Sequence, residues 1–167
     1  MARKDTLLKE KIKKIKLIIT DIDGVWTDGG LYYTADGHVM KRFQVKDGMA
    51  VSLLRKKGIE VAIVSGDASE ISVVRGQKLK VELLYKNVSD KKKVLDEICY
   101  LRNLDYKDIA YIGDDINDLE VMKLISLSAA PSDAIKDILN IVDYKCKLKG
   151  GHGAFREFAD YIISNLD

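Results

Sequence analysis

Two aspartates separated by a single residue follow the first apolar segment of the chain. Leu17, Ile18 and Ile19 precede Asp21 and Asp23, and glycine follows at once. Ligands of an open α/β sheet lie beyond the carboxyl ends of its strands, and carboxylates at a buried strand need a partner. The two side chains would point to the same side of an extended backbone, which favours a divalent cation with oxygen ligands. This stretch alone leaves open a surface turn, in which aspartate and glycine are common.

Further polar residues follow three later strands that the sequence predicts. Ser65 comes directly after the predicted strand 59–64, and Lys91 lies shortly after the predicted strand 81–85. The predicted strand 109–112 is followed by a group of carboxylates, namely Asp114, Asp115 and Asp118. Because the carboxyl ends of parallel strands meet at one edge of a sheet, we expect all of these side chains to converge.

Each of these residue types answers a requirement of phosphoryl transfer, which needs an in-line nucleophile and neutralisation of the phosphoryl oxygens. Asp21 can be the nucleophile and form an aspartyl-phosphate, and Asp23 can act as general acid and then as general base. Magnesium held by Asp21 and Asp114 would suppress repulsion between carboxylate and phosphate. Ser65 offers a hydroxyl and a backbone N–H to a phosphoryl oxygen, and Lys91 offers a positive charge.

The order and spacing of these motifs resemble those of the haloacid dehalogenase-like phosphatases. The four motifs are Asp21–Gly29, Ser65-Gly66, Lys91 and Gly113–Asp118. Three further stretches resemble one branch of that family, the small phosphatases of 2-keto-3-deoxy sugar acids: Val25–Gly29, Val45–Gly48 and Gly150–Glu157. That branch includes phosphatases of 3-deoxy-D-manno-octulosonate 8-phosphate (Kdo 8-phosphate) and of nonulosonate 9-phosphates such as those of KDN and sialic acid.

The resemblance implies an Mg²⁺-dependent phosphatase that works through an aspartyl-phosphate. The metal ligands it implies are the side chains of Asp21 and Asp114 and the backbone carbonyl of Asp23, with Asp115 and Asp118 behind them. It also implies a homotetramer in which the C-terminal glycine-rich segment closes the site of a neighbouring copy. We expect no cap domain, since only a hairpin and one helix fit between Gly29 and Ser65.

The residues that the resemblance places around the substrate are Lys46, Asp47, Gly48, Gly66, Asp67, Arg75 and Lys78. Two positions depart from the Kdo 8-phosphate members, because Asp67 and Ser52 stand where those members usually carry arginine. Exchange of a cation for an anion changes which substrates bind, since unpaired like charges are costly. The choice between an eight-carbon and a nine-carbon sugar acid therefore stays open at this point.

The elements that must position these residues alternate between strand and helix along the whole chain. That alternation predicts an α/β fold, with a Rossmann-like parallel sheet and helices on both faces. Ala35-Asp36-Gly37 predicts the turn of a small β-hairpin over about residues 30–43. We expect one domain over residues 1–167. The remaining predicted strands are 16–20, 127–130 and 141–144, and the predicted helices are 7–13, 46–57, 68–79, 90–101, 119–124, 132–139 and 154–165.

Composition excludes several classes of partner. The 28 lysines and arginines nearly balance the 26 aspartates and glutamates, so the net charge of +2 gives no argument for nucleic acid. No apolar run reaches membrane-spanning length, and the N-terminus lacks the apolar core of a signal peptide. The two cysteines, Cys99 and Cys146, are far apart, which favours a reducing cytoplasmic setting.

Several interpretations compete with the catalytic one. A receiver-like module also uses acidic strand ends and Mg²⁺, but it has no task for Asp23, and an inactive oligomeric scaffold would not need every catalytic residue. His152 could reach a substrate across an interface or lie on a mobile surface. Trp26 could form the floor of the site or pack beneath it, and His38 is expected to be structural.

Overall fold

A parallel six-stranded sheet forms the centre of the computed structural model, which describes residues 2–37 and 39–166. The expectation for His38 lies outside the described residues. The strand order is β5-β4-β1-β6-β7-β8, and all neighbours pair in parallel. The strands are β1 Leu17–Thr20, β4 Glu60–Val64, β5 Leu83–Tyr85, β6 Ile109–Ile112, β7 Leu127–Ala130 and β8 Tyr144–Lys145.

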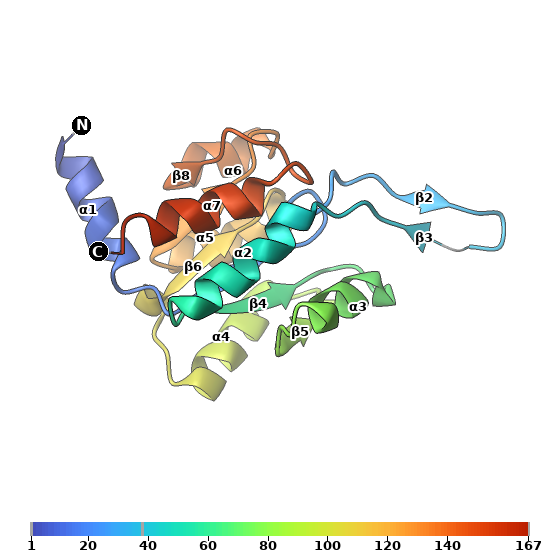
Figure 1. Ribbon diagram of the computed structural model, residues 1–167, viewed down its shortest axis with the longest axis horizontal. Helices are drawn as coiled ribbons and strands as arrows, with labels where there is room; N and C mark the ends of the chain where they lie inside the picture. The colour runs from blue at the N-terminus through green and yellow to red at the C-terminus, as the bar shows by residue number, and fades with distance from the viewer. Residues whose placement is uncertain (1, 38, 167) are drawn as a thin grey trace.

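Helices cover both faces of this sheet (Figure 1). Successive strand residues point to opposite faces, so Ile18 joins one apolar cluster while Leu17 and Ile19 join the other. The first cluster packs under α1 Ala2–Ile12, α2 Val45–Lys56, α3 Glu70–Lys78 and α7 Ala154–Ile163. The second packs under α4 Lys91–Arg102, α5 Leu119–Leu124 and α6 Lys136–Ile141. The predicted doubly wound fold is confirmed.

The order of the strands reverses between β1 and β6. From β1 the chain continues outward to β4 and β5, and then it crosses to β6 and continues outward on the other side to β7 and β8. Thr20 pairs with Ile112 at the end of these two central strands. A crevice at such a reversal, beyond the carboxyl ends of the strands, is where open α/β sheets bind their ligands.

The hairpin formed by β2 Tyr32–Tyr33 and β3 Val39–Met40 projects away from the sheet (Figure 1). Tyr32, Tyr33 and Met40 are all more than half exposed, so the hairpin carries apolar side chains that this chain alone does not cover. As the spacing predicted, no cap domain is inserted between β1 and β4 or between β4 and β6 in the described chain.

Two boundaries near the C-terminus differ from the prediction. The sequence predicted a strand over 141–144, but Ile141 ends α6 and the strand β8 is Tyr144–Lys145. Ile138 and Val142 are both buried and lie four residues apart, which is the spacing of residues on one face of a helix. The apolar residues at this point therefore belong to the end of α6. The predicted helix 132–139 correspondingly begins later, at Lys136. Across the described residues, no helix has the length and apolar character needed to cross a membrane.

Candidate active site

Asp21 lies at the centre of the sheet edge, directly after β1, where its backbone N–H donates to the carbonyl of Ile112 at 3.0 Å. The side chain is 8% exposed. Burial raises the pKa of Asp21 to about 6, although Lys91 works against this shift. Trp26 packs beneath the loop that follows β1. Its indole Nε1 donates to Thr20 Oγ1 at 2.9 Å, and the centre of its ring lies 4.7 Å from the centre of the Phe155 ring. An apolar floor therefore holds the carboxylate in place.

Lys91 is buried at the first position of α4 and bridges two carboxylates. Its Nζ lies 2.9 Å from Asp21 Oδ2 and 2.6 Å from Asp118 Oδ1. Burial opposes the charge of this ammonium, but Asp21 and Asp118 outweigh that effect and raise the pKa of Lys91. The ammonium is thus fixed beside Asp21, as the sequence predicted for the positive charge next to the nucleophile.

Asp118 is fully buried and its carboxylate is occupied by protein partners. Tyr111 donates its hydroxyl to Oδ1 at 2.6 Å, and the backbone N–H of Asp114 donates to Oδ2 at 3.0 Å. Asp115 is exposed and its side chain accepts the N–H of Ile116, which caps the short 3₁₀ turn Ile116–Asp118. These contacts orient Lys91 and the loop of Asp114, and the placement of Asp115 and Asp118 behind the metal ligands stays a prediction.

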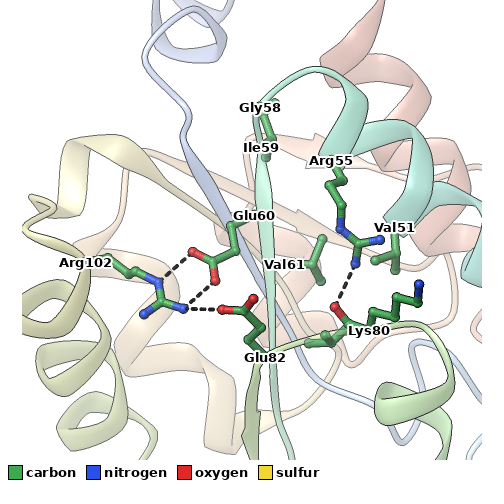
Figure 2. A pocket seen from close by; sticks show the side chains of 10 residues that line it. Val51, Arg55, Gly58, Ile59, Glu60, Val61, Lys80, Glu82 and Arg102 are labelled. Atoms are coloured by element: carbon green, nitrogen blue, oxygen red, sulfur yellow. Dashed lines mark hydrogen bonds and ion pairs between the residues drawn. The ribbon is translucent and has the colours of Figure 1, made fainter.

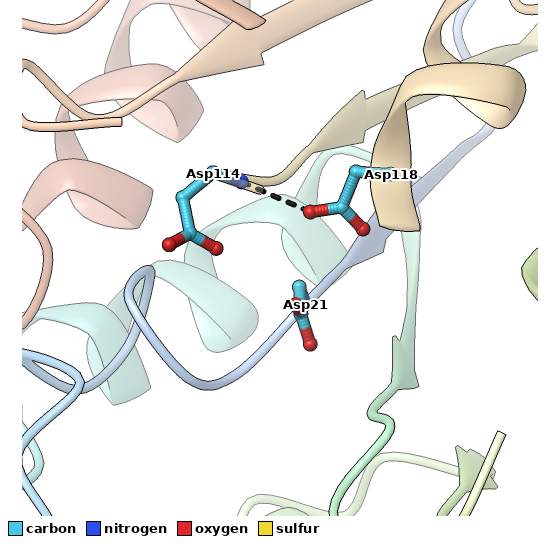
Figure 3. Close-up of side chains that lie close together, drawn as sticks. All are labelled: Asp21, Asp114 and Asp118. Carbon is cyan, nitrogen blue, oxygen red and sulfur yellow. Dashed lines mark hydrogen bonds between the residues drawn. The ribbon is translucent and has the colours of Figure 1, made fainter. Parts of the chain in front are cut away.

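Asp114 faces Asp21 across the crevice (Figure 3). Its Oδ1 is buried and has no hydrogen-bond partner among the described residues. Burial, together with the negative charges of Asp21 and Asp118, raises the pKa of Asp114 to about 8. One ligand atom from each of these three aspartates lies within 4.8 Å of the others. This arrangement of oxygen donors with an unpartnered buried atom fits a hard divalent cation.

Close backbone packing brings these carboxylates together. Gly24 has a φ of +80°, and a Cβ built there would lie 1.9 Å from Asp114 Oδ2. On the other side of the loop, a Cβ at Gly150 would lie 1.9 Å from the carbonyl oxygen of Gly24. Gly151 donates its N–H to Val25 at 2.9 Å. The glycine-rich segment therefore packs against the first motif of its own chain, and its contact with a neighbouring copy stays a prediction.

Asp23 meets a partner that sequence reasoning missed. The ammonium of Lys41, just after β3, lies 2.8 Å from Asp23 Oδ2 and 2.6 Å from Asp67 Oδ2. Thr27 also donates its hydroxyl to Asp23 at 3.3 Å. The contact forms because the folded chain brings the residue after β3 beside the loops that follow β1 and β4, and a lysine within a basic pair, Lys41-Arg42, gives no signal of it.

Ser65 lies at the end of β4 and is 1% exposed. Its backbone N–H is bonded to the carbonyl of Tyr85, so this N–H is already in use, and its Oγ accepts the N–H of Asp67 at 3.2 Å. The Ser65 hydroxyl hydrogen stays available for a phosphoryl oxygen. Gly66 is exposed beside it, where a Cβ would meet only ordinary van der Waals contacts.

The residues predicted around the substrate take several different positions. Asp47 is fully buried, and its Oδ1 accepts the N–H of Arg156 at 2.8 Å, which is the contact of a helix cap on α7 and not of a substrate ligand. Gly48 allows Arg75 to lie close, since a Cβ there would be 2.6 Å from the guanidinium. Lys46 and Lys78 are exposed at the surfaces of α2 and α3.

His152 is exposed and is anchored within its own chain, because its Nδ1 lies 2.8 Å from the carbonyl oxygen of Gly150. Its Nε2 lies 3.4 Å from the guanidinium of Arg42, which also pairs with Asp28 at 3.1 Å. Ser52, at the other position where arginine was expected, is half-buried on α2.

A cavity of about 320 Å³ opens at the converging carboxylates. The described residues that line it include none of Lys46, Asp47, Arg75 and Lys78; they are Asp21, Asp23, Gly24, Gly29, Asp114, Asp115, Ile116 and Asn117. A second cavity, of about 460 Å³, lies at the opposite end of the sheet (Figure 2). There Arg102 forms a bidentate pair with Glu60, and Arg55 donates to backbone carbonyls, so both guanidinium groups have partners.

Comparison with known proteins agrees with this geometry. Residues 67–157 match the family of haloacid dehalogenase-like hydrolases. The chain is also 36% identical, over 93% of its length and 87% of the relative's, to 3-deoxy-D-manno-octulosonate 8-phosphate phosphatase KdsC of Haemophilus influenzae. The chain belongs to the haloacid dehalogenase-like hydrolases. The resemblance predicted from the four motifs is confirmed.

Two further matches place this hydrolase within the family. N-acylneuraminate cytidylyltransferase A of Danio rerio is 32% identical over 93% of this chain, which corresponds to 36% of that longer protein. The crystal structure of 3-deoxy-D-manno-octulosonate 8-phosphate phosphatase from Moraxella catarrhalis, with magnesium, phosphate and Kdo, superimposes with a TM-score of 0.91 at 29% identity, covering 95% of this hydrolase and 91% of that chain. The expectation of a phosphoric monoester hydrolase agrees with the Kdo 8-phosphate phosphatases among these relatives.

Proposed function

We propose that this hydrolase is an Mg²⁺-dependent phosphatase of a 2-keto-3-deoxy sugar acid and works through an aspartyl-phosphate. The observation that carries the proposal is the convergence of Asp21 and Asp114 at the point where the strand order reverses, with Lys91 fixed 2.9 Å from Asp21. The relatives that bind or act on Kdo and its phosphate support the substrate class.

The Asp21 carboxylate attacks the phosphorus, and the bond from phosphorus to the sugar oxygen breaks. Asp23 supplies a proton to the departing alcohol, and afterwards it takes a proton from the water that hydrolyses the acyl-phosphate and restores Asp21. Asp21, Asp114 and the backbone carbonyl of Asp23 would hold Mg²⁺, which supplies charge neutralisation for the phosphoryl oxygens when bound. Lys91 and the Ser65 hydroxyl hold the remaining phosphoryl oxygens.

Asp67 supports a preference among sugar acids. It lies at the mouth of the site, partly exposed, in the position where arginine is usual in Kdo 8-phosphate members. A carboxylate that is paired with Lys41 can still accept hydrogen bonds from sugar hydroxyls, and it offers no cation to a sugar carboxylate, so it suits the polyhydroxyl tail of a nine-carbon acid. Arg75, Lys46 and Lys78 are the cations left to meet the substrate carboxylate, while the buried Asp47 is left out of the proposed substrate-binding set.

The experiment that tests this proposal is phosphate release with Mg²⁺ from Kdo 8-phosphate and from nonulosonate 9-phosphates, measured side by side. Asp21→Asn is the control, and it should lower kcat by at least about 10⁴-fold because it removes the nucleophile. Asp67→Arg should shift the ratio of kcat/KM toward Kdo 8-phosphate. If the folded protein releases phosphate from neither substrate, the sugar-acid assignment is wrong, and the oligomeric scaffold becomes the better interpretation.

We also propose a homotetramer in the cytoplasm, assembled through the hairpin. The exposed apolar side chains of Tyr32, Tyr33 and Met40 support an interface there, because clustered exposed apolar groups mark contact surfaces. Sedimentation velocity should give the mass of four chains, and Tyr33→Glu should lower it. A monomer at micromolar concentration would contradict this part of the proposal.

A further inference from the structure

Lys41 is buried although it belongs to the most exposed part of the molecule. Its side chain is 1% exposed, whereas Met40 beside it is 63% exposed and Tyr33 across the hairpin is 68% exposed. Lysine is almost never fully buried unless it is paired. The hairpin therefore directs one cation inward, toward the sheet edge that carries Asp21 and Asp23.

The Lys41 ammonium joins three segments that are far apart in the sequence. It lies 2.8 Å from Asp23 in the loop after β1 and 2.6 Å from Asp67 in the loop after β4, while Lys41 itself belongs to the hairpin. Among the described residues, the carboxylates of Asp23 and Asp67 pair with the same cation, the ammonium of Lys41. The other contacts of Asp67 are the N–H and hydroxyl of Ser69, and Asp23 otherwise meets Thr27.

We propose that Lys41 is a positioning residue that fixes the carboxylate of Asp23 for proton transfer to the leaving group. The inference rests on the proposed function, in which Asp23 is the general acid. A carboxylate held by a single hydroxyl can rotate about its side-chain bonds, whereas the buried ammonium fixes the distance and direction of Oδ2. The same ammonium ties Asp23 to Asp67, so the acid is aligned only while the segment directly after β3 stays beside the loops that follow β1 and β4.

A lysine that only stabilised the fold would affect the hydrolysis of different substrates in a different way from a lysine that positions the acid. If Lys41 only holds the hairpin in place, or only lowers the negative charge at the mouth of the site, its loss should slow all phosphate monoesters by a similar factor. If Lys41 positions the acid, its loss should slow most those esters whose leaving group needs a proton. p-Nitrophenyl phosphate and phenyl phosphate separate these cases, since they carry the same charge and similar shape but only p-nitrophenolate departs readily without a proton.

The test compares kcat/KM for these two aryl phosphates, with Mg²⁺, in the wild type and in Lys41→Met. Methionine keeps most of the side-chain length and removes the charge. We expect kcat/KM for phenyl phosphate to fall by roughly 100-fold and the value for p-nitrophenyl phosphate to fall at least about tenfold less, because a positioned general acid contributes about 10²–10⁴-fold. Lys11→Met is the matched control, since Lys11 pairs with Asp143 at 2.9 Å far from the site, and it should leave both values unchanged.

A second variant keeps the proposal testable if Lys41→Met folds poorly, which thermal unfolding of each variant will show. Asp67→Asn keeps Lys41 but weakens its second anchor, and it should shift the ratio of the two substrates in the same direction by a smaller factor. An unchanged ratio in the folded variants would overturn the role of Lys41 and leave the proposed phosphatase intact. A wild type that hydrolyses neither aryl phosphate nor any sugar-acid phosphate would overturn the proposed function itself.

Discussion

The central sheet has a cavity at each end, and the two cavities differ in whether the acidic groups that line them are paired with cations. At the amino end the acids Glu60 and Glu82 both pair with Arg102, and the cavity measures about 460 Å³. At the carboxyl end the cavity is smaller, about 320 Å³, and Asp114 has a buried oxygen without a partner.

This difference separates a cavity that the fold leaves behind from a site built for a ligand. Charges that are paired within the chain cost little and offer little to a ligand, whereas a buried carboxylate without a partner is costly and is kept where a ligand will complete it. The raised pKa of Asp114, to about 8, records that cost, and its causes are burial and the neighbouring negative charges. A buried carboxylate oxygen of Asp47 also has no hydrogen-bond partner among the described residues, so the active site is marked by the convergence of Asp21, Asp114 and Asp118 and not by cavity volume.

Replacement of one glycine by alanine at each end of the sheet should give the largest difference in activity between the two ends. Gly24 and Gly58 have nearly the same φ, +80° and +76°, but a Cβ at Gly24 would strike Asp114, and a Cβ at Gly58 would meet nothing within 4 Å. Both variants should lose about 1–2 kcal/mol of stability from the left-handed backbone. Only Gly24→Ala should also lose activity, by roughly 100-fold, since misplacement by an ångström has that effect. Steady-state kinetics and urea unfolding measure both quantities, and equal activity losses would contradict the comparison.

Magnesium should stabilise the folded protein through the acids at the carboxyl end of the sheet and not through those at the amino end. At a concentration of 100 times its Kd, a ligand that binds only the folded state adds about 2.7 kcal/mol to the free energy of unfolding. We expect Mg²⁺ to raise the melting temperature of the wild type, and of Glu60→Gln, which alters an acid at the amino end. Asp114→Asn should lose most of this rise. Thermal unfolding with EDTA or Mg²⁺ provides the measurement, and a rise that survives in Asp114→Asn would place the ion elsewhere.

Asp47 provides a pH-dependent test close to the carboxyl end. Burial raises its pKa to about 6 in the folded chain, despite the N–H of Arg156 and the charges of Arg75 and Arg156, whereas its ordinary value is 3.8. Between these values the folded state binds more protons than the unfolded state, so this group makes stability fall as the pH rises, by at most about 1.4 kcal/mol per pH unit. Asp47→Asn should remove that slope. Urea unfolding from pH 4 to pH 7 compares the two proteins, and parallel curves would show that Asp47 is not buried as described.

Removal of the ion pairs at the amino end should have the smallest effect. Arg102 is about one-third exposed, so Arg102→Met should lower the free energy of unfolding by roughly 0.5–1 kcal/mol, as for exposed pairs. Phosphatase activity should stay at the wild-type level, because Arg102 lies at the end of the sheet opposite to Asp21. Kinetics and urea unfolding on the same sample test this, and a clear loss of activity would give the larger cavity a role in catalysis.

Most of the fold could be predicted because buried strands leave a strong pattern. The apolar runs that end at Thr20, Val64 and Ile112 became β1, β4 and β6, and the carboxylates that follow the first and the last of these runs lie close together. The edge of the sheet was harder to predict. Tyr144 and Lys145 form a strand of only two residues, and the apolar residues before them are shared with α6, so sequence alone could not separate the end of the helix from the beginning of the strand.

The centre of the site could be predicted, and its periphery could not. Asp21 and Asp114 each follow a buried strand, and the apolar pattern reveals both strands. Asp47 is covered by the N-terminus of α7, and Lys41 is directed inward by a hairpin with strands of two residues each, so both positions depend on contacts across more than 17 residues of sequence. Such contacts leave no local pattern, and a lysine or an aspartate in a polar stretch looks the same whether it is buried or exposed.

The packing of Gly150 and Gly151 on the loop of Gly24 has a consequence for the order of events during synthesis. The segment that supports the backbone of the first motif is made 126 residues after it, since Gly150 packs on Gly24 and Gly151 donates to Val25. At about 5–20 residues per second, the nascent chain spends several seconds with Asp21 already synthesised and its support still missing. The active site is therefore assembled only after Gly150 and Gly151 have been made, and chains truncated before Gly150 should be inactive.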